Sequence, residues 1–200
     1  MTVTSSVLEG AHIRLRKAQM TDAISMWKHV WGNPLVYQRM LFTPTFTAEE
    51  AQDRCRRSII FQKTNPAWLV ALRDTDEAIG MCAIREEQPG HFEEAGLCIG
   101  PQYQHHGFGR EILALLLEYA FCTCTAVDFR YSCFRDNESS KKLAAFFGFC
   151  FDSTFALTRP WDGALKRIDS SILTREDYLA WVCDQKWYSS EDRELRSREK

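Results

Sequence analysis

The sequence lacks several features that would assign the chain to a specialised class of protein. No apolar run approaches the ~20 residues of a membrane span. The eight cysteines include no C-x-x-C pair and no zinc-like spacing. With 25 basic and 27 acidic residues, the formal net charge is −2, so no basic excess attracts nucleic acid. We therefore expect no membrane association, no metal ion and no nucleic-acid partner.

The sequence also shows no pattern typical of a targeting segment or a linker. The opening MTVTSSVLEG has no basic region followed by an apolar core, which predicts no secretory signal and a cytoplasmic protein. No repeat and no Gly/Ser- or Pro-rich linker interrupts the 200 residues, of which 45% are hydrophobic and 26% charged. We expect one domain over 1–200, with a core at about 10–175 and a C-terminal helical extension or tail at 176–200.

The cysteines that are present indicate a reducing environment. Several lie inside apolar runs, such as Cys82 in MCAI and Cys150 in GFCF. Buried, unpaired cysteines are typical of proteins kept reduced inside the cell. We therefore expect reduced and buried thiols.

Hydrophobic periodicity predicts a mixed arrangement of strands and helices. Strands are expected at 12–18, 67–73, 78–86, 93–100, 126–134, 149–160 and 164–174. Helices are expected at 21–32, 47–64, 110–123 and 136–149, followed by a short helix from about 175 that frays after about Tyr188. The fold class is therefore α+β, with a mixed, mostly antiparallel sheet flanked by helices and one central βαβ crossover.

A glycine turn in the stretch CIGPQYQHHGFGRE (98–111) stands between a predicted strand and a predicted helix. Gly107 and Gly109 permit positive φ and the close approach of a ligand. Successive amides beside a helix N-terminus bind anions, and Arg110 adds a positive charge, so the turn suits a diphosphate. The Rossmann pattern fails because Ile112 replaces its last glycine, and the Walker pattern fails because G-K-[ST] is absent.

Two motifs resemble those of one family. The run Gln104–Gly109 matches Q/R-x-x-G-x-G/A and resembles the acyl-CoA-binding motif of the GNAT superfamily of N-acetyltransferases. The stretch DNESSKKLAAFFGF resembles the N-x-x-S-x-x-L-x(4)-G-F helix of its RimJ/RimL-like branch. The order of elements matches over about 10–175. The resemblance implies the GNAT acyl-CoA N-acyltransferase fold, acetyl-CoA as cosubstrate, and direct attack of an amine on the thioester.

The same resemblance implies a set of cofactor-binding residues. The CoA diphosphate would be held by loop amides, with Arg110 beside them. These loop residues are Gln104, His105, His106, Gly107, Phe108 and Gly109. The strand at 95–100 would split from that at 127–133 and admit the pantetheine arm. Backbone N–H groups near Cys98, Ile99 and Gly100 would hold the thioester carbonyl. Asn137 would contact the pantetheine arm, cap the following helix, or do both.

Catalytic groups are less clearly specified. Ser140 matches a proposed donor to the leaving thiolate, although it also suits the first turn of a helix. Many family members carry a general-acid tyrosine where this chain has Ala144. Glu94 is a candidate base acting through water, the alternative being a solvated carboxylate at a strand end. Cys98 is not expected to be a nucleophile, because a thiol in an apolar strand is not activated.

Other polar residues near these motifs are given structural roles. We interpret Glu111 as tying the start of a helix to its surroundings. His105 and His106 are expected to be exposed at the flank of the CoA site rather than to bind a metal ion, since adjacent histidines rarely ligate one metal well.

The acceptor amine is left open, as a protein N-terminus or a small molecule. Aromatic residues gather in the region that covers the acceptor site in the family, and we expect most to be core and one or two to line a pocket: Trp27, Trp31, Tyr37, Phe42 and Phe46. The chain is expected to be a monomer or a homodimer. Two other interpretations remain, a CoA-binding sensor or scaffold with little catalysis, and an interaction domain without a ligand.

Overall fold

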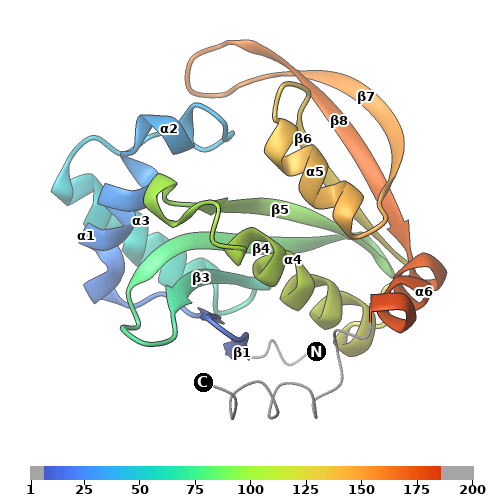
Figure 1. The fold of residues 1–200 in the computed structure, drawn as a ribbon. Coiled ribbons are helices and arrows are strands. Elements are labelled where there is room, and N and C mark those ends of the chain that lie inside the picture. Colours follow the sequence, from blue (N-terminus) through green and yellow to red (C-terminus); the bar gives the residue numbers. More distant parts are fainter. Residues whose placement is uncertain (1–6, 186–200) are drawn as a thin grey trace.

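The computed structural model describes residues 7–185, whose strands form one eight-stranded sheet in the order β1-β2-β3-β4-β5-β6-β8-β7 (Figure 1). The strands are β1 (Val7–Glu9), β2 (Ile13–Arg16), β3 (Ala67–Leu72), β4 (Ala78–Gln88), β5 (His91–Ile99), β6 (Asp128–Phe134), β7 (Cys150–Thr158) and β8 (Leu165–Thr174). Every neighbouring pair is antiparallel except β5 and β6, which are parallel. The predicted mixed, mostly antiparallel sheet with a central crossover is confirmed.

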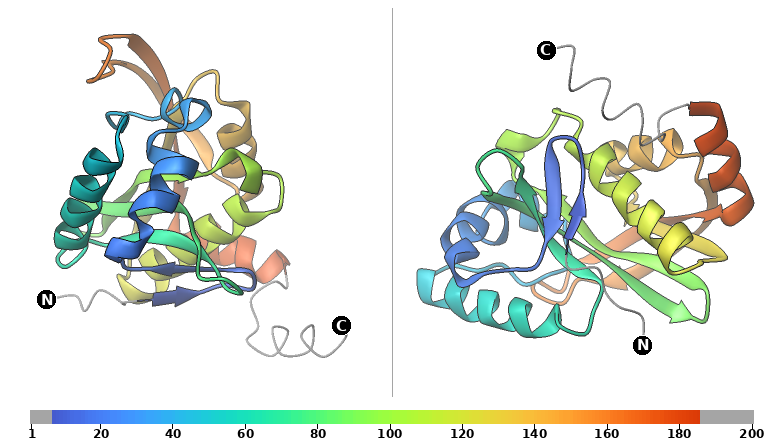
Figure 2. Two further views of the ribbon diagram at one scale, coloured as in Figure 1. Left: turned by 90° about the vertical axis from the view of Figure 1, so that its left-hand side faces the viewer. Right: turned by 90° about the horizontal axis from the view of Figure 1, so that it is seen from below.

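Helices cover both faces of this sheet (Figures 1 and 2). They are α1 (Ala23–Met26), α2 (Pro34–Tyr37), α3 (Ala48–Phe61), α4 (Phe108–Glu118), α5 (Glu138–Phe146) and α6 (Arg175–Gln185). Helices α1 and α3 pack on one face, whereas α4, α5 and α6 pack on the other. Helix α4 makes the crossover between the parallel strands β5 and β6.

The sheet separates two apolar clusters, and alternation along its strands assigns residues to each. On β3, Trp68 belongs to the cluster beneath α4 and α5, whereas its neighbour Leu69 belongs to the cluster beneath α1 and α3. Both side chains are almost completely buried. The central strands are therefore covered on both sides, which explains their continuous apolar runs.

Most elements lie where the hydrophobic pattern places them, but the N-terminal helical region differs. The Thr47–Glu50 capping box is present at the start of α3, as predicted. The helix predicted at 21–32 is instead a 3₁₀ turn, the short α1 and a π-helical turn. The pattern also missed β1 and α2, which are only three and four residues long. The predicted fraying after Tyr188 lies outside the described residues.

Two cysteines in apolar runs of the sheet differ in burial. Cys82 is buried in β4, but Cys150 is exposed because β7 is the last strand of the sheet. Only Cys55, Cys82 and Cys98 are buried among the eight free cysteines. The expectation of general burial was therefore wrong, since a run such as GFCF does not reveal that its strand lies at an edge.

A buried ion pair joins β2 to the first helical turn. Arg16, 6% exposed on β2, donates two hydrogen bonds of 2.8 Å to the Asp22 carboxylate, and its Nε donates to Asp76 at 2.9 Å. The hydrogen bond that Arg16 donates to Asp22 raises the pKa of Arg16, against the opposing effect of burial. Asp22 also accepts from the Gln19 N–H. The network joins β2, the 3₁₀ turn and the β3–β4 turn.

Removing one partner of this network should strongly destabilise the fold. Asp22→Ala leaves the buried guanidinium with Asp76 as its one acidic partner among the described residues. We expect the free energy of unfolding to fall by about 3 kcal/mol in urea denaturation. Asp53→Ala is the control, since its pair with Arg56 is exposed, and it should cost less than about 1 kcal/mol. Equal losses in the two variants would contradict this assignment.

Candidate functional site

A β-bulge in β5 separates two strands that begin as neighbours. Glu94 pairs with Ile84 of β4 and Leu97 pairs with Cys82, so Ala95 and Gly96 oppose a single residue of β4. Gly96 has a φ of +127°, a conformation that favours glycine. Strands β5 and β6 pair only over residues 91–93 and 128–130. Beyond the bulge they separate, which confirms the split expected between these strands.

The split leaves part of the β5 backbone without a neighbouring strand. The Gly100 N–H donates to Ile79 O at 2.8 Å, so Gly100 and, by alternation, Cys98 direct their backbone groups towards β4. Leu97 and Ile99 therefore direct theirs towards the gap. The expectation that Cys98 and Gly100 offer their amides there is corrected, because β4 already uses the Gly100 amide.

The glycine turn after β5 uses two left-handed residues, but only one is a glycine. His105 has a φ of +66° and Gly107 a φ of +86°, and Gly107 is the N-cap of α4. Gly109 does not have positive φ, since α4 already begins at Phe108. The prediction of positive φ at Gly109 was wrong. A Cβ at Gly109 would have Leu143 as its nearest neighbour, at 3.9 Å.

The turn presents a series of unpaired backbone donors. Within residues 7–185, no amide from 105 to 109 has a protein acceptor, and the next, Arg110 N–H, donates to Gly107 O at 3.0 Å. Consecutive amides at a helix N-terminus form an anion site, strengthened by the helix dipole. The Arg110 side chain is exposed and its guanidinium lies 4.1 Å from the centre of the Phe146 ring of α5. The local geometry fits a diphosphate.

Side chains around the turn support its backbone. Gln104 Nε2 donates to Ile99 O at 3.3 Å, folding back onto the open edge of β5. Glu111 accepts from the His12 and Ile13 amides at 2.7 and 3.2 Å, which confirms that it ties α4 to β2. His105 and His106 are exposed, as predicted for the flank of this turn.

Glu94 lies at the bulge, and the pKa of its carboxyl group is raised. Burial raises its pKa to about 8, repulsion from Glu93 acts in the same direction, and a 2.5 Å hydrogen bond from the Gly96 N–H opposes them. Glu93 instead forms an ion pair with Arg85 at the surface. A carboxyl group that titrates near neutral pH suits a general acid or base.

Three further groups meet on the β6 and α5 side of the split. Asn137 caps α5, and its Oδ1 accepts from the Ser140 N–H at 3.3 Å. The Ser140 side chain lies near the phenol of Tyr131, which is 4% exposed. Burial, followed by the charge of Glu94, raises the pKa of Tyr131, so the phenol stays neutral.

Sequence reasoning missed Tyr131 as a member of this group. Alternation on β6 places it on the same face as the buried Phe129, and that alternation was the one signal of its position. Ala144, where a tyrosine is common in the resembling family, is buried.

Cys98 lies nearby but is not a nucleophile candidate. Burial raises the pKa of its thiol to about 12, and the charge of Glu94 adds to this effect. A thiol with this pKa is uncharged at neutral pH, and only the thiolate is nucleophilic. The prediction that Cys98 is unreactive agrees with its surroundings.

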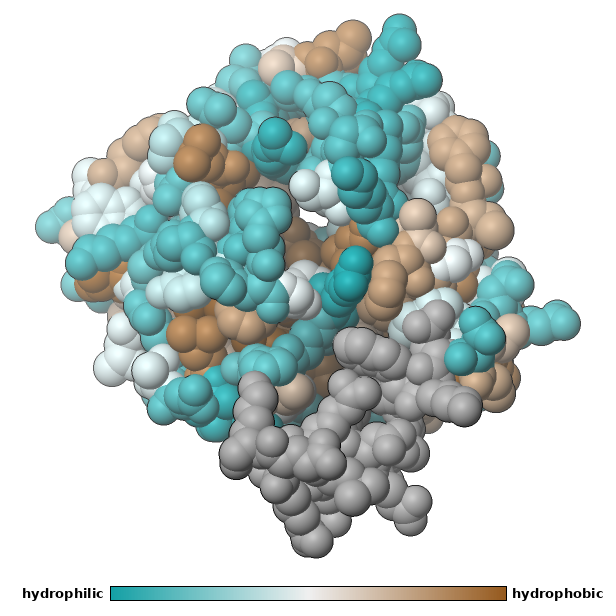
Figure 3. Space-filling model, viewed as in Figure 1, coloured by the Kyte–Doolittle hydropathy of each residue, from teal (hydrophilic) through white to brown (hydrophobic). Residues whose placement is uncertain are grey.

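The opposite side of the sheet carries the region expected to cover an acceptor. Trp31 is 1% exposed and belongs to the core, whereas Phe46 is 68% exposed and lines a groove between α3 and residues 43–46. Figure 3 shows the surface hollowed near the middle of the view, where β5 and α5 lie in Figure 1.

The β7–β8 turn closes over this region. Arg159 Nη1 donates to Gln38 O at 2.6 Å, and Trp161 meets Tyr37 edge to face with ring centres 5.5 Å apart. Asp162 pairs with Arg159 and holds its side chain in place. Figures 1 and 2 show the turn reaching the α2 region, which is far away in sequence.

Comparisons with known proteins agree with this arrangement. A family model described as an acetyltransferase (GNAT) domain matches residues 12–150. A GCN5-related N-acetyltransferase from Brucella melitensis has a similar structure, with a TM-score of 0.79 and 18% identity over 96% of this chain and 89% of that one. A ribosomal-protein-S5-alanine acetyltransferase from Vibrio fischeri is also similar, with a TM-score of 0.67 and 18% identity over 86% and 98%.

At such identities the solved structures show the fold alone. No curated protein sequence matches this chain. Within residues 7–185, no group of three or more His, Cys, Asp or Glu side chains is placed to hold a metal ion. No helix in the same range is long and apolar enough to cross a membrane.

Alanine substitutions should distinguish the two glycines of the turn. Gly107→Ala forces a side chain into the left-handed region, and we expect it to lower the free energy of unfolding by about 1 kcal/mol. Gly109→Ala, in the first turn of α4, should be neutral or stabilising by up to about 1 kcal/mol. Neither Cβ meets a backbone atom within 4 Å, so urea denaturation compares backbone effects alone. Equal destabilisation would contradict the assigned conformations.

Proposed function

This chain belongs to the GNAT acetyltransferase family, and on that premise we propose that it transfers an acetyl group from acetyl-CoA to a primary amine by direct attack on the thioester. We further propose that it belongs to the RimJ/RimL-like branch. The observation that carries the proposal is the run of unpaired amides at 105–109, placed at the N-terminus of α4 and next to the split between β5 and β6.

The diphosphate of CoA is proposed to bind at this run of amides. The donors of His105 to Gly109 point at no protein acceptor in the described part of the chain, and the α4 dipole favours negative charge there. Arg110 adds an exposed positive charge that forms no ion pair with a described residue. Asn137 keeps its side-chain NH₂ available for the pantetheine arm while its oxygen caps α5.

The open edge of β5 is proposed to hold the reacting thioester. The amides of Leu97 and Ile99 face the gap, and donors held in fixed positions stabilise the negative charge that forms on a carbonyl oxygen under attack. The strand geometry therefore shifts this role from the amides of Cys98 and Gly100 to those of their neighbours. Neutral thiols at Cys98 and Cys133 leave the direct route to the amine without a competing nucleophile.

Proton transfer completes the proposed reaction. The amine nitrogen attacks the carbonyl carbon, and its proton passes to the Glu94 carboxylate, directly or through water. The carbon–sulfur bond then breaks, and the CoA thiolate is stabilised by a hydrogen bond from Ser140, which lies near Tyr131. Tyr131 is a positioning residue in this scheme, because it acts through Ser140.

A thiol-release assay tests the proposed function. Release of free CoA thiol should depend on an added amine, and the panel should contain small primary amines and peptides with free N-termini. Calorimetry with acetyl-CoA supplies the binding control. Acetyl-CoA binding without amine-dependent thiol release would indicate a CoA-binding sensor, and no binding at millimolar acetyl-CoA would contradict the proposed cosubstrate.

The pH dependence of the reaction tests Glu94 as the base. Its raised pKa means that the carboxylate forms only as pH increases, so kcat/KM should rise with pH and reach half its plateau near pH 8. Glu94→Gln should lower kcat by about 100-fold and remove this inflection. The substitution should not destabilise the fold at pH 9, because ionising a group whose folded-state pKa is raised opposes folding above its ordinary pKa. An unchanged profile in Glu94→Gln would exclude this role.

A further inference from the structure

Arg54 of α3 is a half-buried cation without an acidic partner in the described part of the chain. Its guanidinium lies 5.1 Å from the Trp31 ring centre and 4.4 Å from that of Phe42. Its Nη1 donates to Thr43 O at 2.7 Å and to Thr45 Oγ1 at 3.2 Å. The structure gives its Nε and Nη2 no acceptor within residues 7–185.

The nearest helical partner for Arg54 is already occupied. Glu50 precedes it by four residues, the spacing at which a glutamate and an arginine pair on a helix surface. Glu50 instead accepts from the Phe46 N–H at 2.7 Å and closes the capping box at Thr47. Trp31 Nε1, next to the guanidinium, is a further buried donor without an acceptor among the described residues. Arg54 and Trp31 therefore both carry donors without an acceptor among the described residues.

The surroundings of Arg54 lower the pKa of its guanidinium. Burial lowers the pKa of Arg54 to about 10, and the positive charge of Arg57 contributes to the decrease. A buried arginine with a carboxylate partner behaves in the opposite way, as Arg16 shows beside Asp22. Bringing an anion to Arg54 would remove this penalty, because a buried charge is costly unless it is paired.

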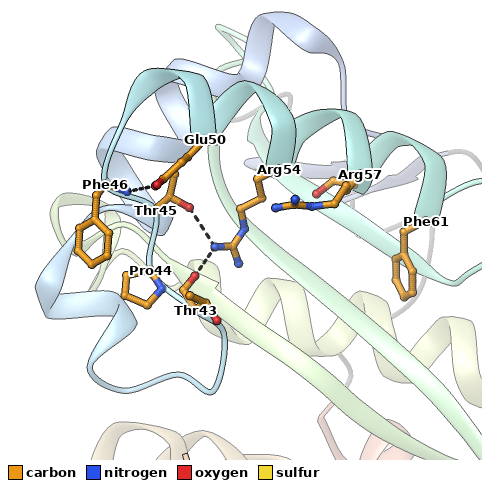
Figure 4. Close-up of a pocket in the computed structure, with 9 residues that line it drawn as sticks. Thr43, Pro44, Thr45, Phe46, Glu50, Arg54, Arg57 and Phe61 are labelled. Carbon is orange, nitrogen blue, oxygen red and sulfur yellow. Dashed lines mark hydrogen bonds between the residues drawn. The ribbon is translucent and has the colours of Figure 1, made fainter. Parts of the chain in front are cut away.

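Arg54 faces a groove rather than a closed core. The groove has a volume of about 640 Å³ and is lined by α3 and residues 43–46. In Figure 4 the Arg54 and Arg57 side chains project from α3 into this groove, and Phe46 and Phe61 stand towards its two ends. Two cations between apolar ends suit a ligand that carries a negative charge.

The groove lies behind the reacting edge of β5. Phe42, which packs against the guanidinium, also packs on the buried cluster that contains Cys98. The charge of Arg54 acts on the Cys98 thiol, opposing the burial that raises its pKa. Cys98 stands between Leu97 and Ile99, whose amides face the split. The α4 turn proposed to hold the diphosphate lies on the other face of the sheet.

From this arrangement we propose that the acceptor amine carries a carboxylate, which binds in the groove to the free edge of the Arg54 guanidinium, with Arg57 one turn further along α3. This inference rests on the proposed function, since it specifies the second substrate of that reaction. A fork of N–H donors matches a carboxylate, and a half-buried guanidinium binds one more strongly than an exposed guanidinium does. The carboxylate belongs either to a free amino acid or to an acidic side chain near a peptide N-terminus.

Matched acceptors test this specificity. Free amino acids are compared with their carboxamides, and peptides with Asp at the second position are compared with those with Asn. For one of these pairs, the wild-type kcat/KM should favour the acid by about tenfold or more. In Arg54→Gln, kcat/KM for the acid should fall to the value for the amide. Arg56→Gln is the matched control, because Arg56 is exposed on the same helix, pairs with Asp53 and does not line the groove.

The response of the two pairs identifies the source of the carboxylate. A preference confined to free amino acids indicates a small-molecule acceptor, and one confined to peptides indicates a protein N-terminus. Equal rates for acid and amide in the wild type, or an equal decrease of both in Arg54→Gln, would overturn the proposal and leave Arg54 as a purely structural anchor of residues 43–45.

A binding measurement separates this proposal from the proposed function. Calorimetry on the protein saturated with CoA uses N-acetyl amino acids and their amides as probes. Acid-selective binding that disappears in Arg54→Gln supports the anion site even if no amine is acetylated. Equal binding of the N-acetyl amino acids and their amides overturns the proposal even if the enzyme is active. If Arg54→Gln does not fold, Arg54→Lys, which keeps the charge but loses the fork, should show a partial loss of acid selectivity.

Discussion

The β-bulge at Ala95–Gly96 is the constraint on which the site depends. A parallel pair of strands normally stays hydrogen-bonded along its length, which would close the sheet between β5 and β6. Two residues of β5 opposite one of β4 turn the strand away after three paired positions. The same bulge places Glu94 in its half-buried position and leaves backbone donors at the open edge. Loss of pairing energy in the sheet is thus linked directly to the formation of the gap between β5 and β6.

Charge is distributed differently on the two sides of this gap. On the α4 face, positive potential comes from backbone amides and a helix dipole, with Arg110 at the surface. On the α3 face it comes from a side chain, Arg54, which is held between aromatic rings. Between the two faces, burial raises the pKa values of the Cys98 thiol, the Tyr131 phenol and the Glu94 carboxyl group. The thiol and the phenol are therefore neutral at neutral pH, and Glu94 is easily protonated. The arrangement allows two anionic ligand groups to approach from opposite faces without meeting fixed negative charge at the centre.

The sequence was informative where a local rule decides the structure. The capping box at Thr47 and the N-cap at Asn137 were both predictable, because each is contained within four residues. Positive φ at His105 was not predicted. The exposure of Cys150 and the approach of Tyr131 to Ser140 were not predictable, because each depends on how distant segments meet. Arg54 escaped notice for the same reason: an arginine four residues after a glutamate predicts an ion pair, and only the fold shows that Glu50 is engaged elsewhere.

The tie between Glu111 and the amides of His12 and Ile13 has a consequence for any shortened or fused form of the protein. The first turn of α4 is held by a strand that lies about a hundred residues earlier in the chain. Deleting residues up to 16 removes no atom of the glycine turn, yet it frees the helix end that positions the turn. Fusion partners and affinity tags joined close to β2 therefore act on the N-terminal end of α4 as well.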